Sequence, residues 1–240
     1  MEHLLLSGSY AETIGRHLGR MKLTSLRVLG MSLLTVVSAE ANQFNIGDTL
    51  SVAEASINPN LVINVKITSP SLNYSGGVYA GINQLTINGS QTVNGFCTDP
   101  FHYSSSSALT YTVVDLANAP KGDPFGSGMG SADALTIEKL WGAHYSAGMS
   151  ATDAATLQLA IWDIVGSTDF STTSTLNTTA NSWISTVNAA GYNGPVADLV
   201  GLTGPGQDYV VQNVPDGGVS VALLGMTFLG LAAVRRKVLA

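Results

Sequence analysis

Two side chains of this sequence, a cysteine and a glutamine, could react with each other. Cys97 lies in the stretch GFCTDPFH and is the only cysteine among 240 residues. Gln158 lies in ATDAATLQLAIWDIVG, residues 151–166. A thiolate can attack a side-chain carboxamide and expel ammonia, which leaves an internal thioester between the two residues. Such a bond needs a dry pocket, because water would hydrolyse it.

On a helix, the neighbours of Gln158 decide whether its amide is buried. The residues three, four and seven positions away are all apolar: Ala151, Ala154, Ala155, Ile161, Trp162 and Val165. We therefore expect Gln158 to be buried, where an amide without hydrogen-bond partners costs about 1–3 kcal/mol. Two arrangements satisfy it. One is a set of hydrogen bonds to the backbone of a neighbouring strand, and the other is a bond to Cys97.

Cys97 also has two interpretations. In an oxidising, exported setting an unpaired thiol is expected to be either buried or reactive. As a small core residue it needs no chemical role. As the thioester partner of Gln158 it needs groups that handle protons, and the candidates are Asp99 and His102, two and five residues further along the chain.

Other kinds of site fit the sequence less well. Cys97, Asp99 and His102 could suggest a cysteine hydrolase, but a catalytic Cys and His usually come from distant parts of a sequence. Only His102 and His144 lie in residues 42–213, without the ligand spacing of a zinc site, so we expect no metal and no cofactor. The same residues hold three lysines and no arginine against twelve acids, a net charge of −9, which argues against a nucleic-acid partner.

The elements that must position Cys97 are expected to be strands. Residues 61–68 (LVINVKIT) alternate apolar and polar side chains, as a half-buried strand does. Gly, Asn and Ser turn signals separate the further strands that we expect. These strands span residues 76–81, 84–88, 92–97 and 109–116. Cys97 would thus end a strand in an antiparallel β region.

The elements that follow are expected to be helical. After a Pro- and Gly-rich loop at 117–130, Ser131 is expected to cap one helix, and Ser150 with Asp153 resembles a capping box for the helix of Gln158. The expected helices and a returning strand span 131–148, 151–166, 181–190 and 204–214. The sequence therefore predicts an α+β fold, an antiparallel β barrel or sandwich with an inserted helical segment.

The two motifs together resemble those of bacterial thioester domains. FCTD at 96–99 and QLAIW at 158–162 carry the resemblance, which spans about residues 77–165. It implies that Cys97 and Gln158 are the bond-forming pair, and it implies supporting roles for Phe96, Asp99, Ile161 and Trp162. His102 is a supporting candidate from its position in the sequence alone. It also implies covalent adhesion, in which the domain couples once to an amine of a surface protein or polymer and is no enzyme. The alternative is a passive structural or carbohydrate-binding envelope protein in which Cys97 and Gln158 are only core residues.

Both ends of the chain indicate export. Lys22 and Arg27 precede an apolar run that reaches Val37, as in a secretory signal peptide, and we expect translation to start at Met21. At the other end, the uncharged run 219–234 precedes three cations: Arg235, Arg236 and Lys237. We expect a C-terminal transmembrane helix whose basic end lies in the cytoplasm.

The C-terminal segment also resembles a sorting signal. Val214, Pro215, Asp216 and Gly217, then the apolar run and its cations, are similar to the PEP-CTERM class in its VPDSG variant, with Gly217 in place of Ser. The resemblance implies processing by an exosortase. We expect the protein to be exported through the inner membrane and to be located in the cell envelope, on the outer surface or in the extracellular matrix of a Gram-negative-type bacterium. The expected organisation is a leader and signal peptide (1–41), an extracellular thioester-domain-like domain (42–213) and a sorting signal (214–240).

Overall fold

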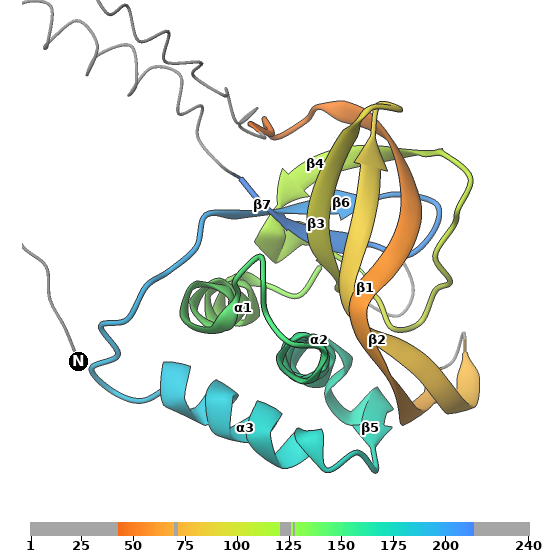
Figure 1. Cartoon of the computed structure of the whole chain (residues 1–240). Coiled ribbons are helices and arrows are strands. Elements are labelled where there is room, and N and C mark those ends of the chain that lie inside the picture. The colour runs from red at the N-terminus through yellow and green to blue at the C-terminus, as the bar shows by residue number, and fades with distance from the viewer. Residues whose placement is uncertain (1–42, 70–71, 121–125, 127, 214–240) are drawn as a thin grey trace, which may run out of the picture. The chain divides into compact units, whose positions relative to one another are not determined.

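The computed structural model describes residues 43–69, 72–120, 126 and 128–213 (Figure 1). The expected signal peptide, the sorting signal and the C-terminal transmembrane helix lie outside these residues. Among the residues that are described, no helix is long and apolar enough to cross a membrane.

The β part is a single antiparallel sheet that closes on itself. Its order is β2-β3-β7-β6-β4-β1-β5, and a further pairing between β1 and β2 joins the two ends of the six-strand run into a barrel. The strands are β1 (Thr49–Thr68), β2 (Asn73–Ile87), β3 (Gln91–Cys97), β4 (Leu109–Asp115), β5 (Phe170–Thr172), β6 (Leu199–Thr203) and β7 (Tyr209–Gln212). The two strands expected at 76–81 and 84–88 are one continuous strand, β2, because no turn interrupts residues 82 and 83.

Among the described residues, three helices are inserted in the strand order, between β4 and β6. They are α1 (Ser131–His144), α2 (Ala151–Gly166) and α3 (Leu176–Val187), with short 3-10 turns at Leu116–Asn118 and Ser167–Asp169. The prediction of an α+β fold, rich in antiparallel sheet and with inserted helices, is confirmed. Figure 1 shows the helices gathered on one side of the barrel.

The helix boundaries correct three expectations. The first helix ends at His144 rather than near Gly148, because Tyr145 takes an extended conformation (φ −77°, ψ 135°). Its N-cap is Gly130, so Ser131 is its first residue and not its cap. The third helix begins at Leu176, before the expected 181. The cap of α2 is confirmed, since the Asp153 N–H donates to Ser150 Oγ at 3.1 Å.

Two groups of buried side chains fill the molecule. The barrel cluster lies inside the ring of strands and consists of Phe44, Val52, Leu85, Ile87, Val93, Tyr111, Val113, Val200, Leu202, Tyr209 and Val211. The helix-side cluster lies between the sheet and the helices and includes Phe96, Cys97, Trp141, Leu157, Ile161 and Trp162. Residues 154–162 of α2 are all buried, so this helix lies between the sheet and its neighbouring helices as a central element.

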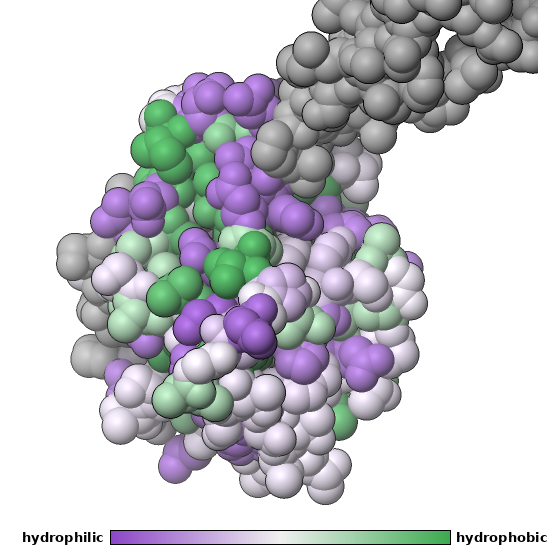
Figure 2. All heavy atoms as spheres, turned by 90° about the vertical axis from the view of Figure 1, so that its left-hand side faces the viewer, coloured by the Kyte–Doolittle hydropathy of each residue, from purple (hydrophilic) through white to green (hydrophobic). Residues whose placement is uncertain are grey.

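One face of the molecule carries both hydrophobic and hydrophilic side chains. Figure 2 shows the face that lies on the left of Figure 1, where apolar side chains form small groups with polar side chains between them. The hydrophobic surface of this face is therefore divided rather than continuous.

Candidate functional site

Cys97 and Gln158 meet where the sheet packs against α2. Cys97 is the last residue of β3 and Gln158 lies in the middle of α2. Their exposed fractions are 2% and 0%. The expectation that Gln158 is buried in an apolar stripe is met, because a barrel strand ends directly over the helix face that carries it.

The carboxamide of Gln158 is held against the main chain of Cys97 by two hydrogen bonds. The Cys97 N–H donates to Gln158 Oε1 at 3.0 Å, and Gln158 Nε2 donates to the Cys97 carbonyl at 2.7 Å. The carboxamide carbon, Cδ, is bonded to both Oε1 and Nε2. The two hydrogen bonds to the Cys97 main chain therefore hold Cδ beside the cysteine that could attack it. The same two bonds satisfy a free glutamine amide, as the backbone-bonded interpretation expects.

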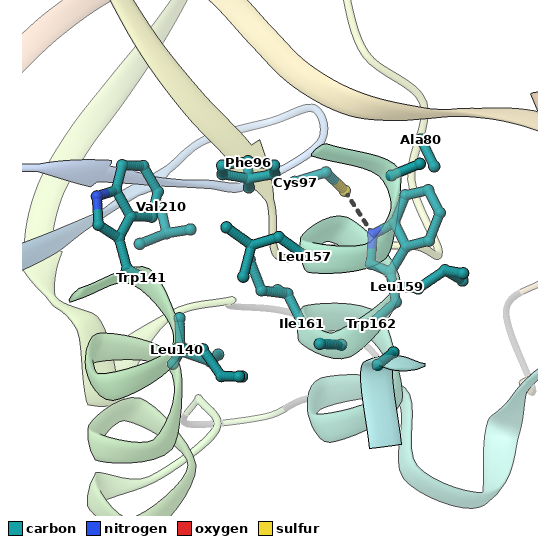
Figure 3. Close-up of a cluster of buried hydrophobic side chains, with 14 of the residues drawn as sticks. Ala80, Phe96, Cys97, Leu140, Trp141, Leu157, Leu159, Ile161, Trp162 and Val210 are labelled. Atoms are coloured by element: carbon teal, nitrogen blue, oxygen red, sulfur yellow. Dashed lines mark hydrogen bonds between the residues drawn. The ribbon is translucent and has the colours of Figure 1, made fainter. Parts of the chain in front are cut away.

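The sulfur of Cys97 has two N–H donors of its own. Trp162 Nε1–H donates to Sγ at 3.2 Å (Figure 3), and the Asp99 main-chain N–H donates to it at 3.3 Å. Trp162 lies one helical turn after Gln158, so α2 presents the amide and the indole to the same residue. Burial and the nearby Asp99 carboxylate raise the pKa of the Cys97 thiol, while both donors act to lower it. These donors favour a thiolate wherever one forms.

Asp99 and His102 form a pair that extends from the buried site toward solvent. His102 Nδ1 lies 2.6 Å from Asp99 Oδ2, and the Phe101 N–H donates to Asp99 Oδ1 at 3.0 Å. Burial raises the pKa of Asp99, and His102 opposes that rise. The Asp99 side chain is buried, whereas that of His102 is 40% exposed. The imidazole of His102 therefore reaches solvent while the carboxylate of Asp99 stays inside.

A cavity of about 260 Å³ opens beside Cys97 and Gln158. Aromatic and aliphatic side chains from β1, β2, β5 and α2 form most of its wall. The lining residues that carry a polar group are Tyr74, Tyr79, Asn83, Cys97, His102, Tyr103, Ser104, Gln158, Trp162 and Gln207. None of its described lining residues is a lysine, arginine, aspartate or glutamate. An uncharged, largely apolar space of this kind limits access of water to a reactive bond.

Asn83 and Glu54 belong to the site but were missed in the sequence. When both polar atoms of the Asn83 amide are satisfied, its nitrogen donates to Glu54 Oε2 at 2.7 Å and its oxygen accepts from the Cys97 N–H at 3.2 Å. The Cys97 N–H is thus shared between Asn83 and Gln158. Burial raises the pKa of Glu54. The sequence did carry a signal for Asn83: it is a polar residue on the same face of β2 as the apolar Leu85 and Ile87.

The remaining predicted residues pack around this centre. Phe96 contacts Trp141 edge to face, with ring centroids 5.3 Å apart, and Ile161 is fully buried beside Leu157 in the same cluster (Figure 3). Gln207 Nε2 donates to the carbonyls of Asp99 and His102, at 3.2 Å each, which ties down the turn after β3. Within the described ranges, no group of three or more His, Cys, Asp or Glu side chains is placed to hold a metal ion.

Comparison with known proteins finds a similarity in the C-terminal segment. A model of the VPDSG-CTERM motif matches residues 213–238. This confirms the resemblance to the sorting signal, and a motif of this kind indicates an exported protein that exosortase-type machinery sorts to the cell envelope. No curated protein matches the sequence at a significant level.

Among solved structures, the chain is similar to the N-terminal thioester domain of the fibronectin-binding protein SfbI from Streptococcus pyogenes. The identity is 14% and the TM-score is 0.37, over 67% of this chain and 97% of that domain. A similarity at this level says nothing about individual residues. Only the contacts of Cys97 and Gln158 in this chain therefore indicate what chemistry the site could perform.

Proposed function

We propose that this protein attaches covalently to amine-bearing partners through an internal thioester between Cys97 and Gln158. The observation that carries the proposal is the buried carboxamide, which two hydrogen bonds hold against the cysteine at the floor of an uncharged cavity. The motif resemblance around both residues supports the same conclusion. The partner would be a surface protein or polymer.

In the bond-forming step, the sulfur of Cys97 attacks the side-chain carbon of Gln158. The new bond joins Sγ to Cδ, the bond from Cδ to Nε2 breaks, and the thiol proton leaves with the nitrogen as ammonia. The Cys97 N–H already points at Oε1, so it stabilises the negative charge that develops on that oxygen.

In the capture step, a partner amine attacks the same carbon. The new bond joins the amine nitrogen to Cδ, the bond to sulfur breaks, and an amine proton ends on the thiol. Trp162 and the Asp99 N–H stabilise the departing thiolate. His102, held by Asp99, is the group placed to accept the proton from the amine. The product is a stable amide, so each molecule reacts once and is not an enzyme.

The cellular setting follows from the sorting signal. Export and sorting to the envelope would present the domain to partners on the outer surface or in the extracellular matrix of a Gram-negative-type bacterium. The expected membrane helix after residue 218 would hold the chain until exosortase-type machinery processes it.

A second candidate is a passive structural or carbohydrate-binding envelope protein. It is favoured because both polar atoms of the Gln158 amide have a hydrogen-bond partner, so the side chain needs no thioester to be stable in the core. In that case Cys97 and Gln158 have only a packing role.

Incubation with a biotin-labelled primary amine separates the two candidates. The wild-type chain should acquire a label that survives boiling and reduction and maps to residue 158. Cys97→Ala and Gln158→Ala should acquire none, and Gln84→Ala should be labelled like the wild type, because Gln84 contacts Ser56 and not the site. A wild-type chain that takes no label, and whose thiol is alkylated on unfolding, is the passive protein.

A further inference from the structure

The first half of β2 has a described partner strand on one edge only. β1 pairs with β2 from Thr68 opposite Asn73 to Val52 opposite Ile87, whereas β3 pairs only with residues 83–87. Among the described residues, no strand pairs with the second edge of β2 over residues 74–79, which we call the outer edge. In Figure 1 this half of β2 extends with β1 below the barrel.

Main-chain groups of the outer edge point away from β1. The Asn64 carbonyl accepts from Thr172 Oγ1 at 2.7 Å, so the main-chain groups of Asn64 point toward β5 and away from β2. Asn64 is paired with Gly77 of β2. Because the two residues of such an antiparallel pair do not bond each other, Gly77 points its own N–H and C=O away from β1. The contact of the Gly77 carbonyl with the Tyr74 hydroxyl, at 2.9 Å, agrees with this orientation. By alternation, Ser75 and Tyr79 point the same way.

The outer edge borders the cavity of the site. Gly77, Val78 and Tyr79 are consecutive, and all three line the cavity. Because successive side chains of a strand point to opposite faces, a cavity that touches all three runs along the edge and not under one face. The opposite wall includes Pro100, His102, Tyr103 and Ser104, from the segment that follows β3. Cys97 and Gln158 therefore lie between β2 and the segment 100–104 that follows β3.

The surroundings of this opening suit an extended, lysine-bearing polypeptide. Tyr79 is 60% exposed and Tyr103 is 75% exposed on the two sides of the cavity, where their rings can contact an alkylammonium side chain. Residues 42–213 carry a net charge of −9 without any arginine. Charge complementarity thus favours a basic partner. The outer edge offers one more strand the outward N–H groups of Ser75, Gly77 and Tyr79 and the carbonyls of Ser75 and Tyr79, since the Gly77 carbonyl already accepts from Tyr74.

We propose that a partner polypeptide docks as an added strand on the outer edge of β2, and that this docking carries one of its lysine side chains into the cavity. The covalent step rests on the proposed function above, whereas the docking does not need the thioester. A second copy of this chain is a poorer occupant, because residues 42–213 hold only three lysines.

The test uses the purified full-length chain and two short capped peptides. One peptide has a central lysine flanked by threonine and valine. Its twin carries N-methyl groups on alternate residues, so it has the same amine but cannot complete a strand. Formation of the covalent adduct is followed by mass spectrometry, with methylamine as the small reference amine. We expect the unmethylated peptide to react about ten-fold faster than its twin, the effect of one or two net main-chain hydrogen bonds.

Ser75 provides a matched pair of variants. Ser75→Pro removes an outward N–H and leaves the pairing with β1, and Ser75→Ala keeps that N–H. Ser75→Pro should abolish the preference for the unmethylated peptide while methylamine reacts at the wild-type rate, and Ser75→Ala should change neither. Equal rates for the two peptides with the wild type would overturn the proposal, and so would covalent dimers of the chain that form without any peptide.

Failure of the proposed function gives a different result. Neither peptide nor methylamine would then form an adduct, and docking is measured as binding of the fluorescent unmethylated peptide to the Cys97→Ala chain. Weaker binding in the Cys97→Ala, Ser75→Pro double variant than in Cys97→Ala, Ser75→Ala supports the added strand. Equal binding in the two double variants contradicts it.

Discussion

The barrel cluster and the helix-side cluster are both buried, yet they differ in chemistry. The barrel cluster is built of aliphatic and aromatic side chains, and its two tyrosines direct their hydroxyls to Gln207 and Glu54. The helix-side cluster encloses a thiol, and a carboxamide and a carboxylate lie beside it, in Gln158 and Asp99. The barrel thus fixes the strand ends, and α2 brings a carboxamide to one of them.

The largest expected effect is on amine capture, which should depend on Gln158 beside the helix-side cluster and not on Leu85 in the barrel cluster. Gln158→Leu keeps the size of the side chain and removes the carboxamide, so amine capture should disappear completely. Leu85→Ala, in the barrel cluster, should leave capture intact in the folded protein. Labelling with a biotinylated amine measures both. Capture that persists in Gln158→Leu would break the comparison, because another residue would then form the bond.

The next effect concerns stability. Leu85 is fully buried inside the barrel, so Leu85→Ala should lower the free energy of unfolding by about 2–5 kcal/mol. Ile161→Val, on the helix side, removes one methylene and should cost only about 0.5–1.5 kcal/mol. Urea denaturation gives both values. If Leu85→Ala cost no more than Ile161→Val, Leu85 would not be tightly packed inside the barrel.

A smaller effect tests the donor to the sulfur. Trp162→Phe keeps an aromatic ring against Phe170 but loses the N–H that reaches Cys97 Sγ, so amine capture should slow about ten-fold. After capture, the released thiol should also need a higher pH for alkylation. Trp141→Phe is the matched control, because its indole donates to Gln212 at 3.4 Å and not to the sulfur. Equal slowing in both variants would mean that packing alone matters.

The smallest effect is a pH dependence that comes from the buried carboxyl of Asp99 beside Cys97. Burial raises the pKa of Asp99, so near that pKa the folded chain holds a proton that the unfolded chain has released. Folding is therefore penalised above the raised pKa, and the penalty is relieved as pH falls through it toward the ordinary value of about 4. Asp99→Asn cannot ionise, so it should be relatively more stable than the wild type at neutral pH than at pH 4. Parallel pH profiles of unfolding would contradict this.

The sequence predicted the centre of the site better than its surroundings. The apolar stripe around Gln158 and the strand that ends at Cys97 are local patterns, so the meeting of a buried amide and a thiol was foreseeable. The second role of Trp162 was not, because an indole at helical spacing is expected to pack and its hydrogen bond depends on where β3 ends. Asn83 and Glu54 were missed for the same reason, since strand register and barrel closure bring them to Cys97.

The most direct test of the central claim is the mass of the intact protein. The wild-type and Cys97→Ala chains are purified in parallel without added amines, so that both undergo the same processing at their ends. A thioester predicts that the wild-type mass is lower by one ammonia than its sequence requires, and that Cys97→Ala shows no such deficit. A full wild-type mass, together with a thiol that is alkylated when the protein is unfolded, would contradict the thioester.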